Sequence, residues 1–159
     1  MLYRVKQFIK AVTATVTGEE ENWVKGYLSL AEAQLFFRLK VYEQRHCIDV
    51  AKILGERTLQ DREMIRLGLL HDIGKIKYPL NPIEKSLIVL LDKLTQGRIK
   101  KYDQLKMVKC YYKHPQLGCE LLKSIGAYNH FFLEGIKGHH QKEIKEEKIR
   151  LLQEVDNLC

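Results

Sequence analysis

The chain has 159 residues, of which 45% are hydrophobic and 30% are charged, a balance that excludes a disordered protein and fits one folded domain. Lysine and arginine outnumber aspartate and glutamate by 27 to 20, so the net charge of +7 favours an anionic partner: a phosphate ester, a nucleotide, a nucleic acid or a membrane surface. No hydrophobic run reaches the roughly 20 residues that a transmembrane segment needs.

The N-terminal part of the chain has helical periodicity. A first helix that ends at residues 15–18 is predicted by four apolar residues at i, i+3, i+4 and i+7: Val5, Phe8, Ile9 and Val12. Ser29 and Glu32 form a capping-box pattern, which marks another helix start. We expect residues 1–40 to be a helical extension packed on the domain formed by residues 41–159.

Two helices are predicted in the next stretch. The first is expected to end at Gly55, because four residues before it repeat with helical spacing: Cys47, Val50, Ala51 and Leu54. Thr58 is the expected N-cap of the second, and His71 lies on the apolar stripe of that helix.

Asn81-Pro82 with Glu84 combines an N-cap, a proline in the first turn and a returning carboxylate, and so predicts a helix start. Five apolar residues are expected to lie on one side of this helix: Ile83, Leu87, Leu90, Leu91 and Leu94. A basic segment that interrupts the helical pattern begins at Gly97. The basic run from residue 93 to 109 is expected to be a solvated face, with binding of nucleic acid or of an anionic membrane as the alternatives.

Four more helices complete the predicted fold. One covers about residues 104–113, Pro115 opens the next, Asn129 caps a third, and the last runs from about residue 146 to the C-terminus. Strand signals are nearly absent. The sequence therefore predicts an all-α, single-domain helical bundle.

The cysteines indicate a reducing compartment. None of the four belongs to a Cys-x-x-Cys pair, and three fall inside helical patterns, which favours buried reduced thiols: Cys47, Cys110, Cys119 and Cys159. Basic residues interrupt the apolar residues at the N-terminus, unlike the core of a signal peptide. We expect a cytoplasmic protein.

The strongest chemical signal is the adjacent pair His71-Asp72. An imidazole and a carboxylate side by side at a helix end can reach one metal ion, and the carboxylate can bridge to a second. Gly74 is expected to let the backbone turn near the ions. Lys75 follows His71 by four residues, so the two share a face if the helix continues that far, and the lysine can hold a phosphate oxygen.

Further candidate ligands lie at the edges of other predicted apolar faces: His46, His114, His139, His140 and Asp156. Imidazole and carboxylate ligands together suit Mn, Fe, Ni, Co or Zn and fit Ca poorly. A divalent transition metal, as one or two ions, is therefore the expected cofactor.

The order of these residues resembles the HD superfamily of metal-dependent phosphohydrolases, and His71-Asp72-Ile73-Gly74 resembles the motif that names its HDIG subgroup. The resemblance covers about residues 42–157 and implies a helical bundle around one or two metal ions. It implies a first metal held by His46, His71, Asp72 and Asp156. It further implies that Asp72 bridges to a second metal, whose other ligands are His114, His139 and His140.

The resemblance also implies an activity: metal-dependent hydrolysis of a nucleotide, a cyclic nucleotide or another phosphate ester, with Asp72 and Lys75 as catalytic residues. The HD-GYP branch carries Gly-Tyr-Pro after its His-His pair, whereas here Gln141 follows His139-His140, so cyclic dinucleotide specificity is not expected. The alternative is a module that keeps its metals and binds a phosphorylated signal or nucleic acid without turnover. The sequence leaves the substrate, the number of ions and the oligomeric state open.

Overall fold

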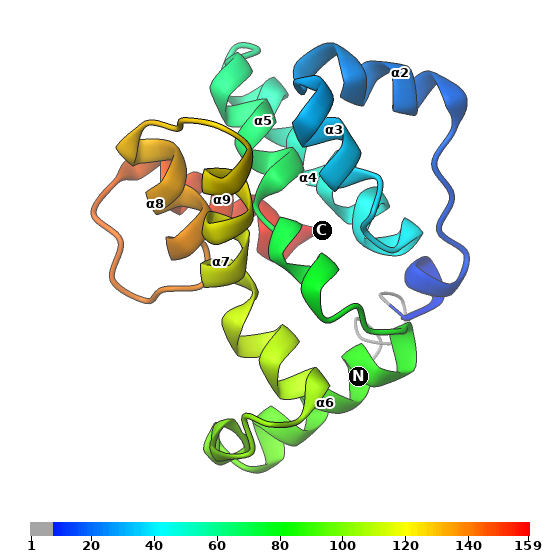
Figure 1. Ribbon diagram of the computed structural model, residues 1–159, viewed down its shortest axis with the longest axis vertical. Helices are drawn as coiled ribbons and strands as arrows, with labels where there is room; N and C mark the ends of the chain where they lie inside the picture. Colours follow the sequence, from blue (N-terminus) through cyan, green and yellow to red (C-terminus); the bar gives the residue numbers. More distant parts are fainter. Residues whose placement is uncertain (1–7) are drawn as a thin grey trace.

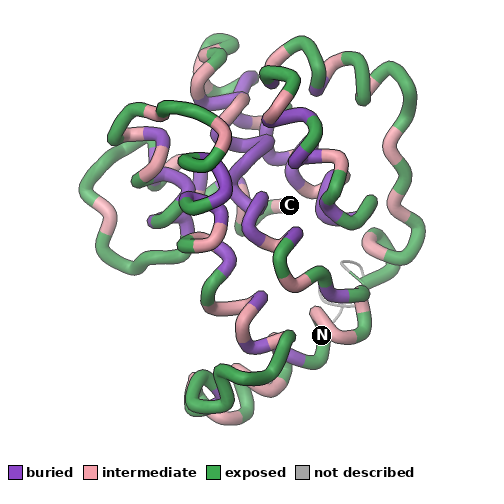
Figure 2. The backbone as a smooth tube through the Cα atoms, viewed as in Figure 1, coloured by how far each residue is buried: buried purple, intermediate pink, exposed green. Residues whose placement is uncertain are grey.

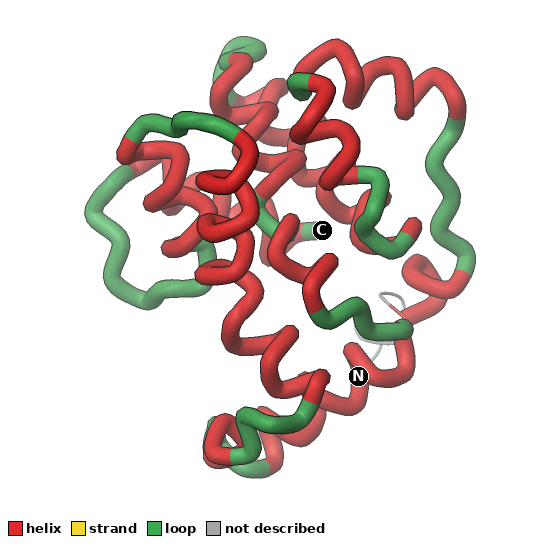
Figure 3. Tube along the Cα trace, in the orientation of Figure 1, coloured by secondary structure: helices red, strands yellow, loops and turns green. Residues whose placement is uncertain are grey.

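The computed structural model describes residues 8–159, and all regular structure in that range is helical (Figure 3), which confirms the all-α prediction. Val5 of the first predicted helix lies outside the described residues; residues 8–12 are helical. The remaining helices are α2 (Gly18–Tyr27), α3 (Leu30–Phe36), α4 (Val41–Arg57), α5 (Arg62–Leu70), α6 (Pro82–Leu94), α7 (Lys106–Ile125), α8 (His130–Gly138) and α9 (Glu147–Leu158), with the 3₁₀ helices η1 (Ile73–Lys77) and η2 (Arg98–Lys101). None of the helices described is both long and apolar enough to cross a bilayer.

Side-chain caps fix several helix starts. Three of them confirm the predictions from capping patterns: Ser29 for α3, Asn81 for α6 and Asn129 for α8. Thr58 is the C-cap of α4 and not the N-cap of α5, so that prediction is wrong. Asp61 caps α5 instead, because its carboxylate accepts the backbone N–H groups of Glu63 and Met64.

The main core lies between α4, α5 and the helices around them, and buried residues are concentrated at the centre of the bundle (Figure 2). α2 and α3 contribute to this same core through Val24, Leu28 and Phe36. α4, α5, α7, α8 and α9, which carry the candidate metal ligands, all contribute to this packed interior, where side chains keep fixed positions.

Glu20 ties α2 to α4. Its Oε1 accepts hydrogen bonds from Arg45 Nη1 at 2.6 Å and Lys52 Nζ at 2.7 Å. The hydrogen bond from Arg45 is the main cause that lowers the pKa of Glu20 from 4.5 to about 2. Because the folded-state pKa lies below the unfolded one, the ionised carboxylate stabilises the fold above pH 4.5, and this contribution is lost as the pH falls from 4.5 towards 2.

Glu20→Gln is therefore expected to lower the free energy of unfolding by about 1–2 kcal/mol at neutral pH. The difference from the native chain should shrink as the pH falls from 4.5 to about 2, as measured by urea denaturation. Glu19→Gln, in the same helical turn, is the control and should change little. A destabilisation by Glu20→Gln that stays constant with pH would contradict this account.

α7 is one continuous helix from Lys106 to Ile125 with Pro115 inside it, so the prediction of two helices that meet at Pro115 is wrong. A proline cannot donate the hydrogen bond to the carbonyl four residues before it. Contacts of α7 with η1 and α8 hold the helix together through this point. The long helix joins the main core to a smaller one beside α6.

The smaller core lies at one end of the molecule and consists of Leu80, Ile88, Ile99, Val108 and Cys110. Ile88 is the buried residue of α6. Four of the five apolar residues predicted on one side of this helix are exposed to solvent: Ile83, Leu87, Leu90 and Leu94. α6 packs on α7 through its opposite side.

Candidate metal centre

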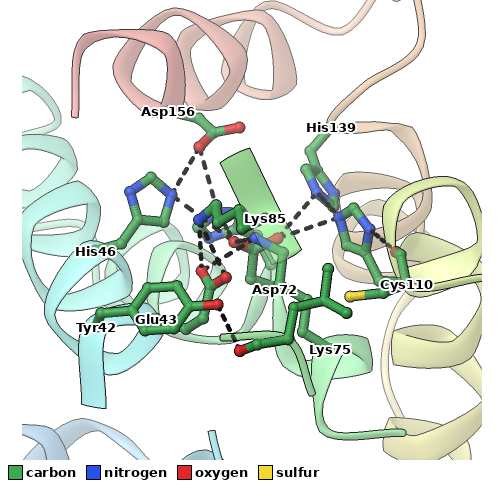
Figure 4. A network of polar contacts seen from close by, with 12 residues as sticks. Tyr42, Glu43, His46, Asp72, Lys75, Lys85, Cys110, His139 and Asp156 are labelled. Carbon is green, nitrogen blue, oxygen red and sulfur yellow. Dashed lines mark hydrogen bonds and ion pairs between the residues drawn. The ribbon is translucent and has the colours of Figure 1, made fainter. Parts of the chain in front are cut away.

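Five helical segments bring side chains to one polar cluster in the interior (Figure 4). α4 supplies His46, the end of α5 supplies His71 and Asp72, α7 supplies His114, the end of α8 supplies His139, and α9 supplies Asp156. Figure 4 shows Asp72 at the centre, with His46 and Asp156 on one side and His139 on the other. The residues singled out from the sequence therefore converge on one place.

Each oxygen of Asp72 faces a different pair of imidazoles. Oδ2 lies 3.8 Å from His46 Nε2 and 3.5 Å from His71 Nε2. Oδ1 lies 3.2 Å from His114 Nε2 and 3.6 Å from His139 Nε2. This is the arrangement in which one carboxylate can bridge two cations.

Asp156 completes the first group of ligands. Its Oδ1 lies 2.8 Å from His46 Nε2 and 3.5 Å from His71 Nε2. We call His46, His71, Asp156 and Asp72 Oδ2 the first subsite. The first subsite thus combines two imidazoles with two carboxylates. This is the mixed donor set that transition metals prefer.

The second subsite consists of Asp72 Oδ1, His114, His139 and His140, and the ligand atoms of these four residues lie within 4.8 Å of one another. His114 and His139 are buried, with their Nε2 atoms 3.2 Å apart. His140 is more exposed, and its Nδ1 lies 4.0 Å from Asp156 Oδ2, between the two subsites.

Backbone carbonyls orient three of the imidazoles. In each, Nδ1 lies 2.7–2.8 Å from a carbonyl oxygen, so Nδ1 carries the proton and donates it: His71 to Gly68, His114 to Cys110 and His139 to Ile136. The Nε2 atoms then turn towards Asp72, as metal ligands held by a hydrogen bond on the other ring nitrogen do.

Two buried polar atoms at the centre lack a hydrogen-bond partner among the described residues: His71 Nε2 and Asp72 Oδ1. One belongs to each subsite. A buried polar atom without a partner is unfavourable, and each such atom is expected to have an explanation. A cation in each subsite supplies one, so the residues present fit a pair of divalent metal ions.

The electrostatics keep the carboxylates ionised. Burial opposes ionisation of Asp72, but the charge of Lys75 and the neighbouring imidazoles hold the pKa of Asp72 well below its usual value. Burial lowers the pKa of His139 to about 4, so this ring is neutral, the state that binds metals. Burial also acts to lower the pKa of His71, but the charges of Asp72 and Asp156 raise it to about 9, so a proton and a metal compete for this nitrogen.

Lys75 is positioned by η1 and not by a continuation of α5. α5 ends at Leu70 and the chain continues as η1, so the condition for a shared helical face with His71 is not met. Lys75 Nζ lies 2.5 Å from Asp72 Oδ2 and 3.1 Å from Glu43 Oε2. The lysine therefore lies beside Asp72, at the edge of the first subsite.

Glu43 and Lys85 belong to this network, although the sequence interpretation did not single them out. Glu43 is 4% exposed, and its carboxylate accepts hydrogen bonds from Lys75 and, at 3.0 Å and 3.1 Å, from Lys85 of α6. The available signal was an acidic residue one helical turn before His46 on the same face of α4. No local pattern connects it with Lys85, which lies 42 residues further on.

Gly74 has a different role from the expected one. Gly97 is the glycine with a positive φ among the described residues, so Gly74 is not needed for a turn. A Cβ atom on Gly74 would lie 1.9 Å from the carbonyl oxygen of His114 and 2.6 Å from the backbone nitrogen of Gly118. The absence of a side chain lets η1 cross α7 closely, which brings Asp72 next to His114.

Comparison with known proteins gives one match. A family model of the HD domain matches residues 44–158, a range that contains all the residues of both subsites. Neither the curated proteins nor the solved structures contain a match to this chain.

Proposed function

The chain belongs to the HD domain family, and from this premise we propose that it is a phosphohydrolase with two divalent metal ions, acting on a nucleotide or another small phosphate ester. Members of the family are generally metal-dependent hydrolases. The observation that carries the proposal is the position of Asp72, whose two oxygens face two separate pairs of imidazoles. The tetrapeptide that starts at His71 supports assignment to the HDIG subgroup.

The two ions, when bound, would polarise a phosphoryl oxygen and lower the pKa of water, so that hydrolysis proceeds near neutral pH. The histidines, Asp72 and Asp156 would hold them, and this donor set suits Mn, Fe, Ni, Co or Zn. Burial opposes the positive charge of Lys75, but Asp72 and Glu43 raise its pKa well above the usual value. Lys75 therefore stays cationic, and we assign to it the contact with a charged phosphoryl oxygen.

Metal analysis followed by a substrate screen tests this proposal. We expect about two transition-metal ions per chain, and turnover of a phosphate ester that is lost with a chelator and restored by Mn or Ni. A chain that retains its ions and binds nucleotides without turnover would be a binding module. Steeply salt-dependent binding of RNA or DNA would indicate a nucleic-acid partner instead. Purified protein without metal or turnover would overturn the proposal.

Glu43→Gln tests the role of the buried carboxylate that holds Lys75 and Lys85. We expect kcat/KM to fall about 10- to 100-fold while the metal content stays unchanged, because the amide cannot hold the two ammonium groups as strongly. Glu134→Gln, a surface substitution of the same chemistry on α8, is the control. Loss of one ion from Glu43→Gln would show that Glu43 is itself a ligand, and unchanged turnover would show that it is dispensable.

A further inference from the structure

The outward side of α6 carries a continuous apolar stripe. Ile83, Leu87, Leu90 and Leu94 follow one another at i, i+4, i+7 and i+11, a spacing that places them on one face of the helix. Their exposed fractions are 68%, 42%, 53% and 70%. We call these four residues the outer face of α6.

The other side of the helix is already occupied. Lys85 donates to Glu43, Ile88 is fully buried in the smaller core, and Asp92 accepts hydrogen bonds from Tyr111 and Tyr112. These three residues lie on the side of the helix opposite the outer face. α6 therefore cannot bury its outer face by rotating, since that would expose Ile88 and break the polar contacts.

Cations gather at the end of the same helix. We call Lys93, Arg98, Lys100 and Lys101 the basic tip; all four are exposed. The acidic side chains nearby are engaged elsewhere: Glu84 with Lys106 at 3.3 Å, Asp92 with the tyrosines, and Asp103 with Lys113 at 3.0 Å. Among residues 8–159, no carboxylate forms an ion pair with the basic tip.

We propose that the outer face and the basic tip dock this protein on an anionic lipid bilayer. An amphipathic helix binds in the plane of a membrane by burying leucines at the acyl boundary while lysines and arginines contact lipid phosphates. α6 lies at one end of the longest axis of the molecule, where a flat surface can approach it (Figure 1). Tyr102 and Leu105, each 44% exposed, lie in the segment that follows and add further apolar surface.

The alternatives fit these features less well. A nucleic acid would use the cations but leave four exposed aliphatic side chains without a partner. Two antiparallel copies of α6 would bury the stripe, but Ser86 and Lys93 flank it on one side, so no acidic residue would face Lys93. Lipid phosphates match both the apolar and the charged part of the surface.

Sedimentation of the full chain with lipid vesicles tests the proposal. We expect binding to vesicles of phosphatidylcholine mixed with phosphatidylglycerol, weakened by salt, and little binding to phosphatidylcholine alone. Leu90→Glu should weaken binding about tenfold or more, because it places a charge in the middle of the outer face. The double substitution Lys100→Gln/Lys101→Gln should weaken it about 25-fold, at about fivefold for each charge removed.

Leu30→Glu makes the same chemical change at a residue that is 78% exposed on α3, and it should leave vesicle binding unchanged. Thermal unfolding and metal content are measured for every variant, so a loss of binding in a folded, metal-containing chain is independent of the proposed hydrolysis. Absence of binding by the native chain, or binding that Leu90→Glu leaves intact, would overturn the proposal. A dimer that Leu90→Glu dissociates, without vesicle binding, would overturn it in favour of a second copy.

Discussion

Asp72→Asn is expected to remove metal from both subsites and to lower kcat/KM by about a thousandfold or more. Asp72 is the side chain whose two oxygens face the two imidazole pairs. An asparagine presents one oxygen and an NH₂ group that donates hydrogen bonds, so it cannot ligate on both sides. Metal ions per chain, measured by elemental analysis, and turnover of the best substrate from the screen are the two measurements.

Single-subsite variants provide the matched comparison. Asp156→Asn changes a residue whose Oδ1 lies 2.8 Å from His46 and 3.5 Å from His71 of the first subsite, closer than its Oδ2 lies to His140, so we expect it to lose about one ion. His139→Gln should lose the other ion, because His139 lies beside Asp72 Oδ1. If Asp72→Asn loses no more metal than either variant, Asp72 does not bridge.

The local signals explain which parts of the fold were predictable. The starts of α3, α6 and α8 were correct because a capping side chain bonds to backbone only a few residues away, so the pattern lies within one turn. The set of residues that form the polar cluster was also predictable, since their order along the chain resembles the HD superfamily. The structure brings these residues together, from segments as far apart as His46 and Asp156.

Long-range packing explains what local patterns could not indicate. α6 has apolar residues on two sides, and only the position of α7 decides that Ile88 is buried while Leu87 and Leu90 are exposed. Pro115 predicts a helix start because the first turn of a helix tolerates a residue without a backbone N–H. In the structure, contacts with η1 and α8 keep α7 continuous through Pro115. Glu43 acquires its partners from other elements, which no periodicity in α4 can reveal.

Gly74 is also constrained by a distant element, because the atoms next to it belong to α7. Gly74→Ala is expected to lower the free energy of unfolding by about 3 kcal/mol or more and to reduce metal content. The added Cβ would meet three backbone atoms, the His114 oxygen at 1.9 Å, the Gly118 nitrogen at 2.6 Å and the His114 carbonyl carbon at 2.8 Å, and none of them can move aside as a side chain does. η1 must therefore shift away from α7. Urea denaturation with metal analysis measures both effects.

Two other glycines separate this close crossing from the general effect of adding a methyl group. Gly126→Ala has open space, with its nearest contact at 3.7 Å, and should change stability by less than about 1 kcal/mol. Gly118→Ala lies on the α7 side of the same crossing, where the added Cβ would meet a side-chain carbon of Ile136 at 3.1 Å and the Gly74 nitrogen at 3.3 Å, so we expect an intermediate loss. If Gly74→Ala retains both ions, the crossing of η1 and α7 does not determine how Asp72 and His114 meet. Loss of metal before loss of the fold would show that this crossing aligns the two subsites.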